Sequence, residues 1–420
     1  MSIDHGSLPA QRRSLLDTIE RRAGLTLSGL GGIAVAVIAW VIGNHVGGRS
    51  LYLAAYCGVI LVGVSVALSR RRRPLEAERS SLPRRARVGQ SLDVRITLRA
   101  RARTSTFRLE EEVHPHLAPS VVVPIPLIAP GDEVEHGYVI QPRLRGVYMV
   151  GPLTAEFSDP MGFAKRRQLL LPATEIIVHP QVEDVLDRPL TRAFEDPPVR
   201  PPKSRPWPQG FEFYGMRDYV PGDDLRRVVW RAFGRTDRLL VREFEQGISD
   251  RIAVVLDTDV ERHSRGEVSE TFETAVSVAA SVGVRHIKDG LTVRLVANQG
   301  ALGGAFRGPR ARLPFLDELA RVERSREPLW RALELLATSG RSDDHVIIVS
   351  GHLDSRAASL ANLMVNNGAS ITMCTLLWEE ADPMTMRRAR EVGAQVVKVK
   401  RGASLGGVFR ASLQTKAGAR

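Results

Sequence analysis

Acidic side chains follow a buried strand in the second half of the chain. The run from Arg251 to Asp257 reads RIAVVLD, a continuous apolar stretch typical of a strand covered on both faces. Asp257, Asp259 and Glu261 stand there at alternate positions. Carboxylate oxygens are the ligands that hard cations such as Mg²⁺ prefer. The spacing makes these three residues candidate metal ligands, with a solvated acidic loop held by its own hydrogen bonds as the alternative.

The elements around this loop alternate between strand and helix over residues 246–400. Apolar runs at 251–257, 291–298, 345–351, 370–378 and 394–400 predict strands, and 301–308 predicts a short edge hairpin. Helices are expected at 269–288, 314–337 with an interruption at Pro328, 355–366 and 383–393. This order predicts an α/β doubly wound parallel sheet. Ligands of such sheets bind beyond the carboxyl ends of the strands. Those ends hold Asp257 to Asp259, Asn298, Ser350-Gly351 and Glu379-Glu380.

Three other segments have different composition. Residues 91–180 alternate in short runs broken by Gly and Pro, which predicts a small β-sandwich. Residues 181–209 are rich in Pro and Arg and predict an extended linker. Residues 401–420 include a glycine-rich stretch that does not open a helix after a strand, so we expect a flexible tail.

Two uncharged apolar runs lie near the N-terminus, at residues 25–43 and 51–68. As helices, each would span roughly 27–28 Å, close to the thickness of a bilayer core. The linker between them contains one arginine, whereas four arginines precede the runs and four follow them. The positive-inside rule therefore predicts a two-span anchor within residues 1–90, in the cell membrane, with both termini in the cytoplasm.

Charge and cysteine content exclude other classes of protein. The chain has 59 Lys and Arg against 47 Asp and Glu, a net charge of +12. Residues 1–90 hold roughly 13 of the basic and 5 of the acidic residues, so most of the surplus lies beside the apolar runs. We therefore expect the lipid bilayer, and no nucleic acid, as a partner. Two cysteines are too few for a disulfide scaffold or a zinc finger.

The most distinctive local pattern covers residues 210–245, which we call the signature segment. It reads as turn, helix, turn and strand. Asp223 is placed to cap a helix that begins near residue 224, and Gly234 is placed to end it. Val229 and Phe233 have the spacing to face inward, with Trp230 beside them. The pattern suits either a structural docking element or a partner-binding surface, and nothing in it pairs a nucleophile with a base.

The signature segment resembles the motif of the domain-of-unknown-function 58 family. The matching residues with a partner-binding or structural role are Glu212, Arg217, Tyr219, Pro221, Gly222, Asp223, Arg226, Trp230 and Arg235. The match also includes Gly210, Phe213, Leu239, Val241, Glu243 and Glu245. Gly234 stands where the family usually has Ala. The upstream runs RLRGVYMVGPL and DPMGF look like two further family elements.

The resemblance implies a fold and a role. Family members are bacterial membrane-anchored proteins with a von Willebrand factor A-like domain. They are typically encoded beside MoxR-type AAA+ ATPases and are thought to act with them in chaperone-like assembly or metal insertion. We therefore expect a non-enzymatic interaction protein whose partner is such an ATPase.

The same resemblance bears on the acidic loop. Von Willebrand A-like domains often bind Mg²⁺ through D-x-S-x-S and a later Asp. Here Asp259 and Glu261 replace the two serines, and Gly351 stands at the expected place of the later Asp. The implied metal site is therefore degenerate, and a bound Mg²⁺ is one of two open alternatives.

An enzyme is the competing hypothesis. The run VVLDTDVE resembles the first motif of haloacid-dehalogenase-like phosphohydrolases, and VIIVS resembles their second. Asp257 would then be the nucleophile, Asp259 the acid/base and Ser350 a phosphate ligand. Against this, no Lys lies between Ser350 and Glu379, and Arg356 would be an unusual substitute. The final acidic group, Glu379, Glu380 and Asp382, also departs from the expected pattern.

Overall fold

A computed structural model describes residues 24–70, 75–185, 212–220, 228–236, 238–245, 251–339, 345–377 and 382–408. The chain divides into two compact units, Met1–His179 and Pro180–Arg420. Most of the expected linker and much of the expected tail lie outside the described residues, as do Pro221, Gly222, Asp223 and Arg226.

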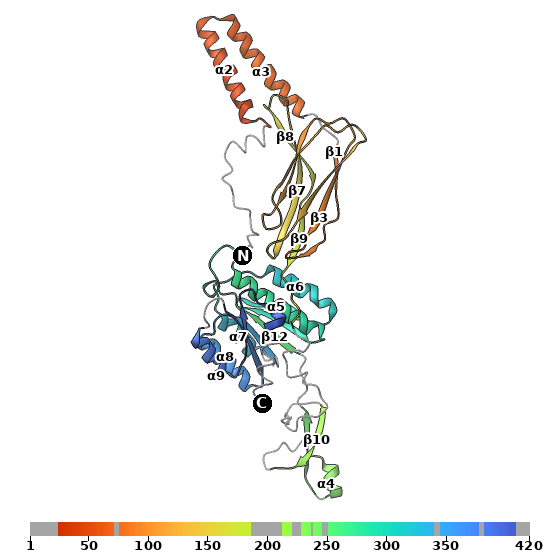
Figure 1. Ribbon diagram of the computed structural model, residues 1–420, viewed down its shortest axis with the longest axis vertical. Helices are drawn as coiled ribbons and strands as arrows, with labels where there is room; N and C mark the ends of the chain where they lie inside the picture. Colours follow the sequence, from red (N-terminus) through yellow and green to blue (C-terminus); the bar gives the residue numbers. More distant parts are fainter. Residues whose placement is uncertain are drawn as a thin grey trace. The chain divides into compact units, whose positions relative to one another are not determined.

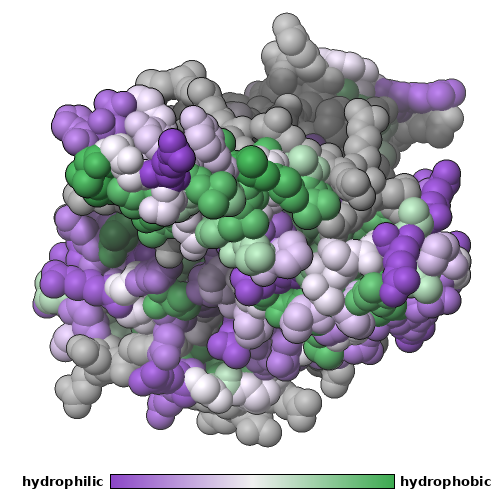
Figure 2. Space-filling view, turned by 90° about the horizontal axis from the view of Figure 1, so that it is seen from above, coloured by the Kyte–Doolittle hydropathy of each residue, from purple (hydrophilic) through white to green (hydrophobic). Residues whose placement is uncertain are grey.

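The first unit begins with a helical hairpin formed by α2 (Leu27–Val46) and α3 (Arg49–Arg70) (Figure 1). Small residues line the contact between the helices and allow them to approach closely. A Cβ added at Gly58 of α3 would lie only 3.2 Å from Cβ of Ala36 in α2. Many large apolar side chains of both helices are exposed instead of packed. Figure 2, seen from above Figure 1, shows a band of hydrophobic surface. Both helices are long and apolar enough to cross a membrane, as the sequence predicts.

The rest of the first unit consists of two β-sheets with a shared core (Figure 1). One sheet has the order β1 (Leu75–Arg79), β3 (Leu92–Ala100), β6 (Glu133–Ile140). The other has the order β2 (Arg85–Arg87), β9 (Thr174–His179), β7 (Gly146–Ser158), β4 (Phe107–Val113), β5 (Val121–Ile125), with β8 (Lys165–Leu171) paired to β7. In β3, buried and exposed residues alternate, so its apolar side chains enter the core.

The predicted boundary of this sandwich at residue 91 is wrong. Strands β1 and β2 pair with β3 and β9 and belong to the sandwich, which begins at Leu75. The short charged sequence LEAER of β1 has two inward-facing apolar residues, Leu75 and Ala77, and gives only a weak strand pattern.

In the second unit, the signature segment forms an antiparallel pair of strands with a short helix. Its elements are β10 (Glu212–Asp218), α4 (Trp230–Thr236) and β11 (Leu240–Glu245). The sequence predicts a turn, a helix, a turn and a strand here, and this prediction does not include strand β10. The predicted helix start near residue 224 lies outside the described residues, but Val228 forms a β-bridge with Val241 and α4 begins at Trp230. Gly234 lies inside α4 and does not end it.

The remainder of the second unit is a six-stranded sheet covered by helices. Its order is β14 (Gly300–Phe306), β13 (Thr292–Ala297), β12 (Arg251–Leu256), β15 (His345–Ser350), β16 (Ser370–Leu377), β17 (Gln395–Lys400). All neighbouring strands are parallel except β14, which is the antiparallel edge. The predicted strands and the edge segment are confirmed.

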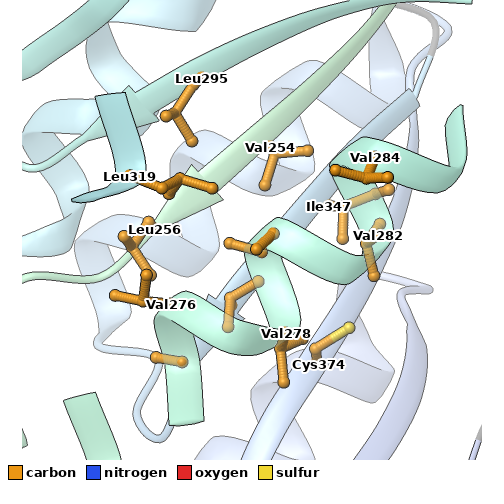
Figure 3. Close-up of a cluster of buried hydrophobic side chains, with 14 of the residues drawn as sticks. Val254, Leu256, Val276, Val278, Val282, Val284, Leu295, Leu319, Ile347 and Cys374 are labelled. Atoms are coloured by element: carbon orange, nitrogen blue, oxygen red, sulfur yellow. The ribbon is translucent and has the colours of Figure 1, made fainter. Parts of the chain in front are cut away.

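The helices of this domain divide its core into two layers. Val254 and Leu256 of β12 contribute to a core that includes α5 (Glu270–Lys288) and α6 (Arg312–Arg321) (Figure 3). Ala253 and Val255 contribute to the other core, which includes α7 (Leu329–Thr338), α8 (Ser355–Asn366) and α9 (Pro383–Glu391). All five helices match expected segments, and Pro328 caps α7 at the predicted interruption. The order of the strands reverses between β12 and β15, and the candidate site lies at that point.

Candidate functional site

Three buried polar residues meet at the carboxyl ends of β12, β13 and β15. Asp257 follows β12, Asn298 follows β13 and Ser350 ends β15. Each is at most 2% exposed. Parallel strands bring their carboxyl ends to the same edge of a sheet, so residues far apart in sequence come into contact here.

The Asp257 carboxylate is satisfied by protein donors. Its Oδ2 accepts a hydrogen bond of 2.6 Å from the Ser350 hydroxyl. Its Oδ1 accepts one of 2.8 Å from the Asn298 amide and one of 3.1 Å from the backbone N–H of Asp259. Because buried carboxylates require such partners, this network holds three strand ends together. The side chain is 1% exposed, and both of its oxygens are directed at donors of the protein.

The loop after Asp257 is fixed by a second set of hydrogen bonds. The backbone N–H of Ser325 donates to Thr258 O over 2.7 Å, and that of Val260 donates to Ser325 O over 2.8 Å. The Thr258 hydroxyl lies 3.0 Å from the Ser325 hydroxyl and 2.9 Å from Oε1 of Gln299. The His263 ring donates to Asp257 O over 2.9 Å. Sequence reasoning missed these partners, because no local pattern places residue 325 beside residue 258.

The three candidate metal ligands are not brought together. Asp259 caps a 3₁₀ turn, η3 (Val260–Arg262), and its Oδ1 accepts a 3.0 Å hydrogen bond from the Glu261 N–H. Glu261 itself is exposed. The 3₁₀ turn replaces the extended backbone that would place alternate side chains on one face. In the described part of the chain, no group of three or more His, Cys, Asp and Glu side chains is placed to hold a metal ion.

Two further residues considered from the sequence have defined places here. Gly351, at the expected place of the later Asp, follows β15, and the β15 residue that contacts Asp257 is Ser350. Asp382, expected in a phosphohydrolase motif, caps α9 and accepts a 2.7 Å hydrogen bond from the Thr385 hydroxyl. Glu379 and Glu380 lie outside the described residues.

A histidine and a carboxylate that were not predicted as a pair lie beside this edge. Nδ1 of His352 is 3.4 Å from Oδ2 of Asp382. The hydrogen bond from Thr385 lowers the pKa of Asp382, whereas burial and the nearby Arg262 lower the pKa of His352. At neutral pH the imidazole is therefore uncharged, and the contact is not an ion pair.

The signature segment has a different character, because its described apolar side chains are exposed. Trp230 is 59% exposed and Phe233 is 40% exposed, which contradicts the expectation that Phe233 faces inward with Trp230 beside it. We call the exposed apolar residues of this segment the signature patch: Met216, Val220, Trp230 and Phe233. No local sequence feature distinguishes such a surface from an inward-facing helix face.

The other predicted signature residues have mixed placements. Arg217 pairs with Val241 across the strands and donates to the carbonyl of Asp218 over 3.0 Å. The backbone N–H of Tyr219 donates to Leu239 O over 2.8 Å. Glu212 pairs with Glu245 at the end of the β10–β11 ladder, and Arg235 lies in α4.

Comparisons with known proteins give one family and weak structural likenesses. A von Willebrand factor type A structure from Catenulispora acidiphila is 16% identical over 40% of this chain and 42% of that one, with a TM-score of 0.32. The CARDB domain of a Pyrococcus furiosus protein is 12% identical over 25% of this chain and 88% of that one, with a TM-score of 0.20. At these scores neither likeness carries a functional argument. No curated protein matches the chain. The model of the family described as "Protein of unknown function DUF58" matches residues 215–376 of this chain, which confirms the predicted resemblance over those residues.

Proposed function

We propose that this chain is a membrane-anchored, non-enzymatic interaction protein whose partner is a MoxR-type AAA+ ATPase. Its work would be chaperone-like maturation or assembly of a client protein. The proposal assigns membrane anchoring to the two apolar helices and a von Willebrand A-like fold to the six-stranded sheet. Support for the ATPase comes from the family resemblance of the signature segment.

The observation that carries the proposal is the signature patch. Trp230 and Phe233 are exposed on a short helix next to the β10–β11 pair. Tryptophan is enriched among the residues that dominate binding energy at protein interfaces, and exposed aromatic side chains gain free energy when a partner covers them. The patch therefore has the chemistry of a protein-binding surface.

The buried state of Asp257 supports a role without catalysis. A nucleophile must reach its substrate, but Asp257 is 1% exposed and both of its oxygens accept hydrogen bonds. The phosphohydrolase alternative is tested by a phosphatase assay on the purified full chain and on Asp257→Asn. Turnover that is lost in the variant would overturn the proposal.

Partner binding is tested by affinity capture from a detergent extract, with ATP, ADP or no nucleotide. We compare wild type, Trp230→Ala, Phe233→Ala and the control Leu363→Ala, which removes a 48% exposed apolar side chain from α8. Losing a central aromatic contact should weaken ATPase binding tenfold or more, equivalent to at least about 1.4 kcal/mol. The control should bind like wild type.

Two results would count against the proposal. One is recovery of no AAA+ ATPase by wild type under any nucleotide condition. The other is equal recovery by wild type and Trp230→Ala, which would remove the signature patch from the interface even if the ATPase binds elsewhere.

A further inference from the structure

The turn between β7 and β8, residues 159–164, is attached to the first residues of the helical hairpin. The Thr26 hydroxyl donates to Gly162 O over 2.5 Å, and the Thr26 N–H donates to Phe163 O over 3.0 Å. The Lys165 N–H donates to Gly24 O over 2.8 Å. Thr26 is also the N-cap of α2, so these bonds hold the turn at the point where the apolar helix begins.

The Phe163 ring lies beside the apolar helix, beyond its first turn. A Cβ added at Gly32 would lie 3.8 Å from a ring carbon of Phe163 and 3.5 Å from Cγ2 of Val62 in α3. Gly32 is five residues into α2, a rise of about 8 Å along the helix axis. The 20 residues of α2 span about 30 Å, which is the thickness of the hydrocarbon core. If α2 crosses the bilayer, the ring of Phe163 therefore lies below the bilayer surface.

The turn has features that suit such a position. Met161 in this turn is 59% exposed. The buried Asp159 carboxylate accepts the N–H groups of Met161 over 3.0 Å and Ala164 over 2.7 Å. The N–H of Gly162 donates to Asp159 O over 3.1 Å. Backbone N–H groups that enter lipid must form hydrogen bonds within the protein. The N–H groups of Met161, Gly162 and Ala164 meet this requirement through Asp159.

We propose that the β7–β8 turn inserts Met161 and Phe163 into the acyl-chain region of the phospholipid bilayer beside α2. The inference rests on the membrane anchoring in the proposed function and extends it, because the sandwich itself then binds lipid. The lipid-facing surface of α2 continues through Phe163 to Met161. Insertion at this point fixes the sandwich against the membrane surface and limits its freedom to rotate about the end of the hairpin.

The experiment measures the depth of fluorescent labels in the full chain, reconstituted in phosphatidylcholine–phosphatidylglycerol vesicles. Met161→Cys and the control Met149→Cys, both made with Cys57→Ala, carry an environment-sensitive label. Met149 is 50% exposed on β7, about 30 Å before that strand ends. A third sample carries the label on the native Cys57, which is exposed on α3. Cys374 is buried and does not react.

Spin labels attached to the lipid acyl chains should quench labels at positions 57 and 161 at least threefold more than the label at position 149. Aqueous iodide should quench position 149 most. If the lipid spin labels quench position 57 but quench position 161 no more than position 149, the insertion of the turn is overturned and the anchoring by the helices remains intact. Absence of lipid quenching at position 57 would overturn the anchoring, and the insertion with it. Met161 is exposed, so its replacement does not disturb packing in the fold.

Discussion

At the scale of single residues, the described carboxyl edge of the sheet contains a network of buried hydrogen bonds centred on Asp257. Asp257 connects β12 to Asn298 and Ser350, and the loop after it is held by Ser325. A cation or phosphate would have to compete with hydrogen bonds that are already formed in the interior. The acidic residues next in sequence, Asp259 and Glu261, are used for a turn cap and a solvated surface.

Asp257→Ala tests this assignment. It removes the Oδ1 acceptor shared by the Asn298 amide and the Asp259 N–H, and one of the two acceptors near the Ser350 hydroxyl, which keeps His352 O at 2.7 Å. A buried donor left unpaired costs about 1–3 kcal/mol. We expect the free energy of unfolding, measured with urea, to fall by about 2 kcal/mol. Glu261→Gln, at an exposed position, should change it by less than about 0.5 kcal/mol. Equal stability of Asp257→Ala and wild type would contradict a structural role.

His286 gives a pH-dependent prediction. Burial lowers its pKa, its Nδ1–H donates to Val282 O over 2.8 Å, and its buried Nε2 has no hydrogen-bond partner among the described residues. The folded state therefore binds the proton less readily than the unfolded state, whose pKa is about 6.5. The neutral His286 therefore contributes fully to the free energy of unfolding above pH 6.5. This contribution is lost as the pH falls from 6.5 toward the pKa of His286 in the folded state.

The loss is at most about 1.4 kcal/mol per pH unit for one proton. Denaturant titrations at a series of pH values from 7.5 down should give a smaller decline for His286→Leu than for wild type. The same slope in both proteins would show that another group causes the acid sensitivity.

At the scale of elements, the α/β domain could be predicted from sequence almost entirely. Its strands are continuous apolar runs and its helices have caps such as Ser269 and Asp354, so each element carries its own local signal. The signature segment could not be predicted in this way. Strand β10 owes its position to pairing with β11, and a β-bridge joins Val228 to Val241 just before α4. Such contacts depend on distant partners.

The candidate site was predictable only in part for the same reason. The sequence places Asp257 at a strand end, but it does not reveal that Ser350 and Asn298 occupy its carboxylate. The exposure of Trp230 and Phe233 also depends on what packs around α4. Spacing alone indicates amphipathic character and cannot tell whether an apolar face is covered by the same chain.

The contact between α5 and α6 gives a prediction at this scale. A Cβ at Gly283 would lie 2.1 Å from Cζ of the buried Phe315. Replacing a helical Gly by Ala ordinarily stabilises by about 1 kcal/mol, but overpacking costs about 1–3 kcal/mol. Gly283→Ala should therefore lower the melting temperature of the α/β domain. Gly234→Ala, which has open space in α4, should not.

The double variant Gly283→Ala with Phe315→Leu gives the decisive comparison. If the clash is the cause, the smaller Leu side chain should recover part of the loss, so that the two effects are not additive. If the effects of the two substitutions on stability are strictly additive, the loss in Gly283→Ala does not come from contact with Phe315.

At the scale of the whole molecule, charge and hydropathy point to one arrangement about the bilayer. Most basic residues of the first 90 positions lie before α2 or after α3, while the short connection Gly47-Gly48 is followed by a single arginine, Arg49, at the start of α3. Binding of the signature patch to the proposed ATPase requires the second unit to be in the cytoplasm. The topology is therefore the assumption on which partner binding depends.

Reporter fusions test the topology directly. A cytoplasm-active reporter such as β-galactosidase, fused after Lys416, should be active, because the positive-inside rule predicts that the flanking arginines keep both ends of the hairpin inside. Alkaline phosphatase, which needs the oxidising exterior, should be inactive at the same position and active when it follows Gly47 between the two helices. Expression of each fusion is checked by immunoblot, so that inactivity is not mistaken for absence. The reverse pattern would place the sheet domain outside the cell, away from ATP, and would exclude a cytoplasmic AAA+ ATPase as its partner.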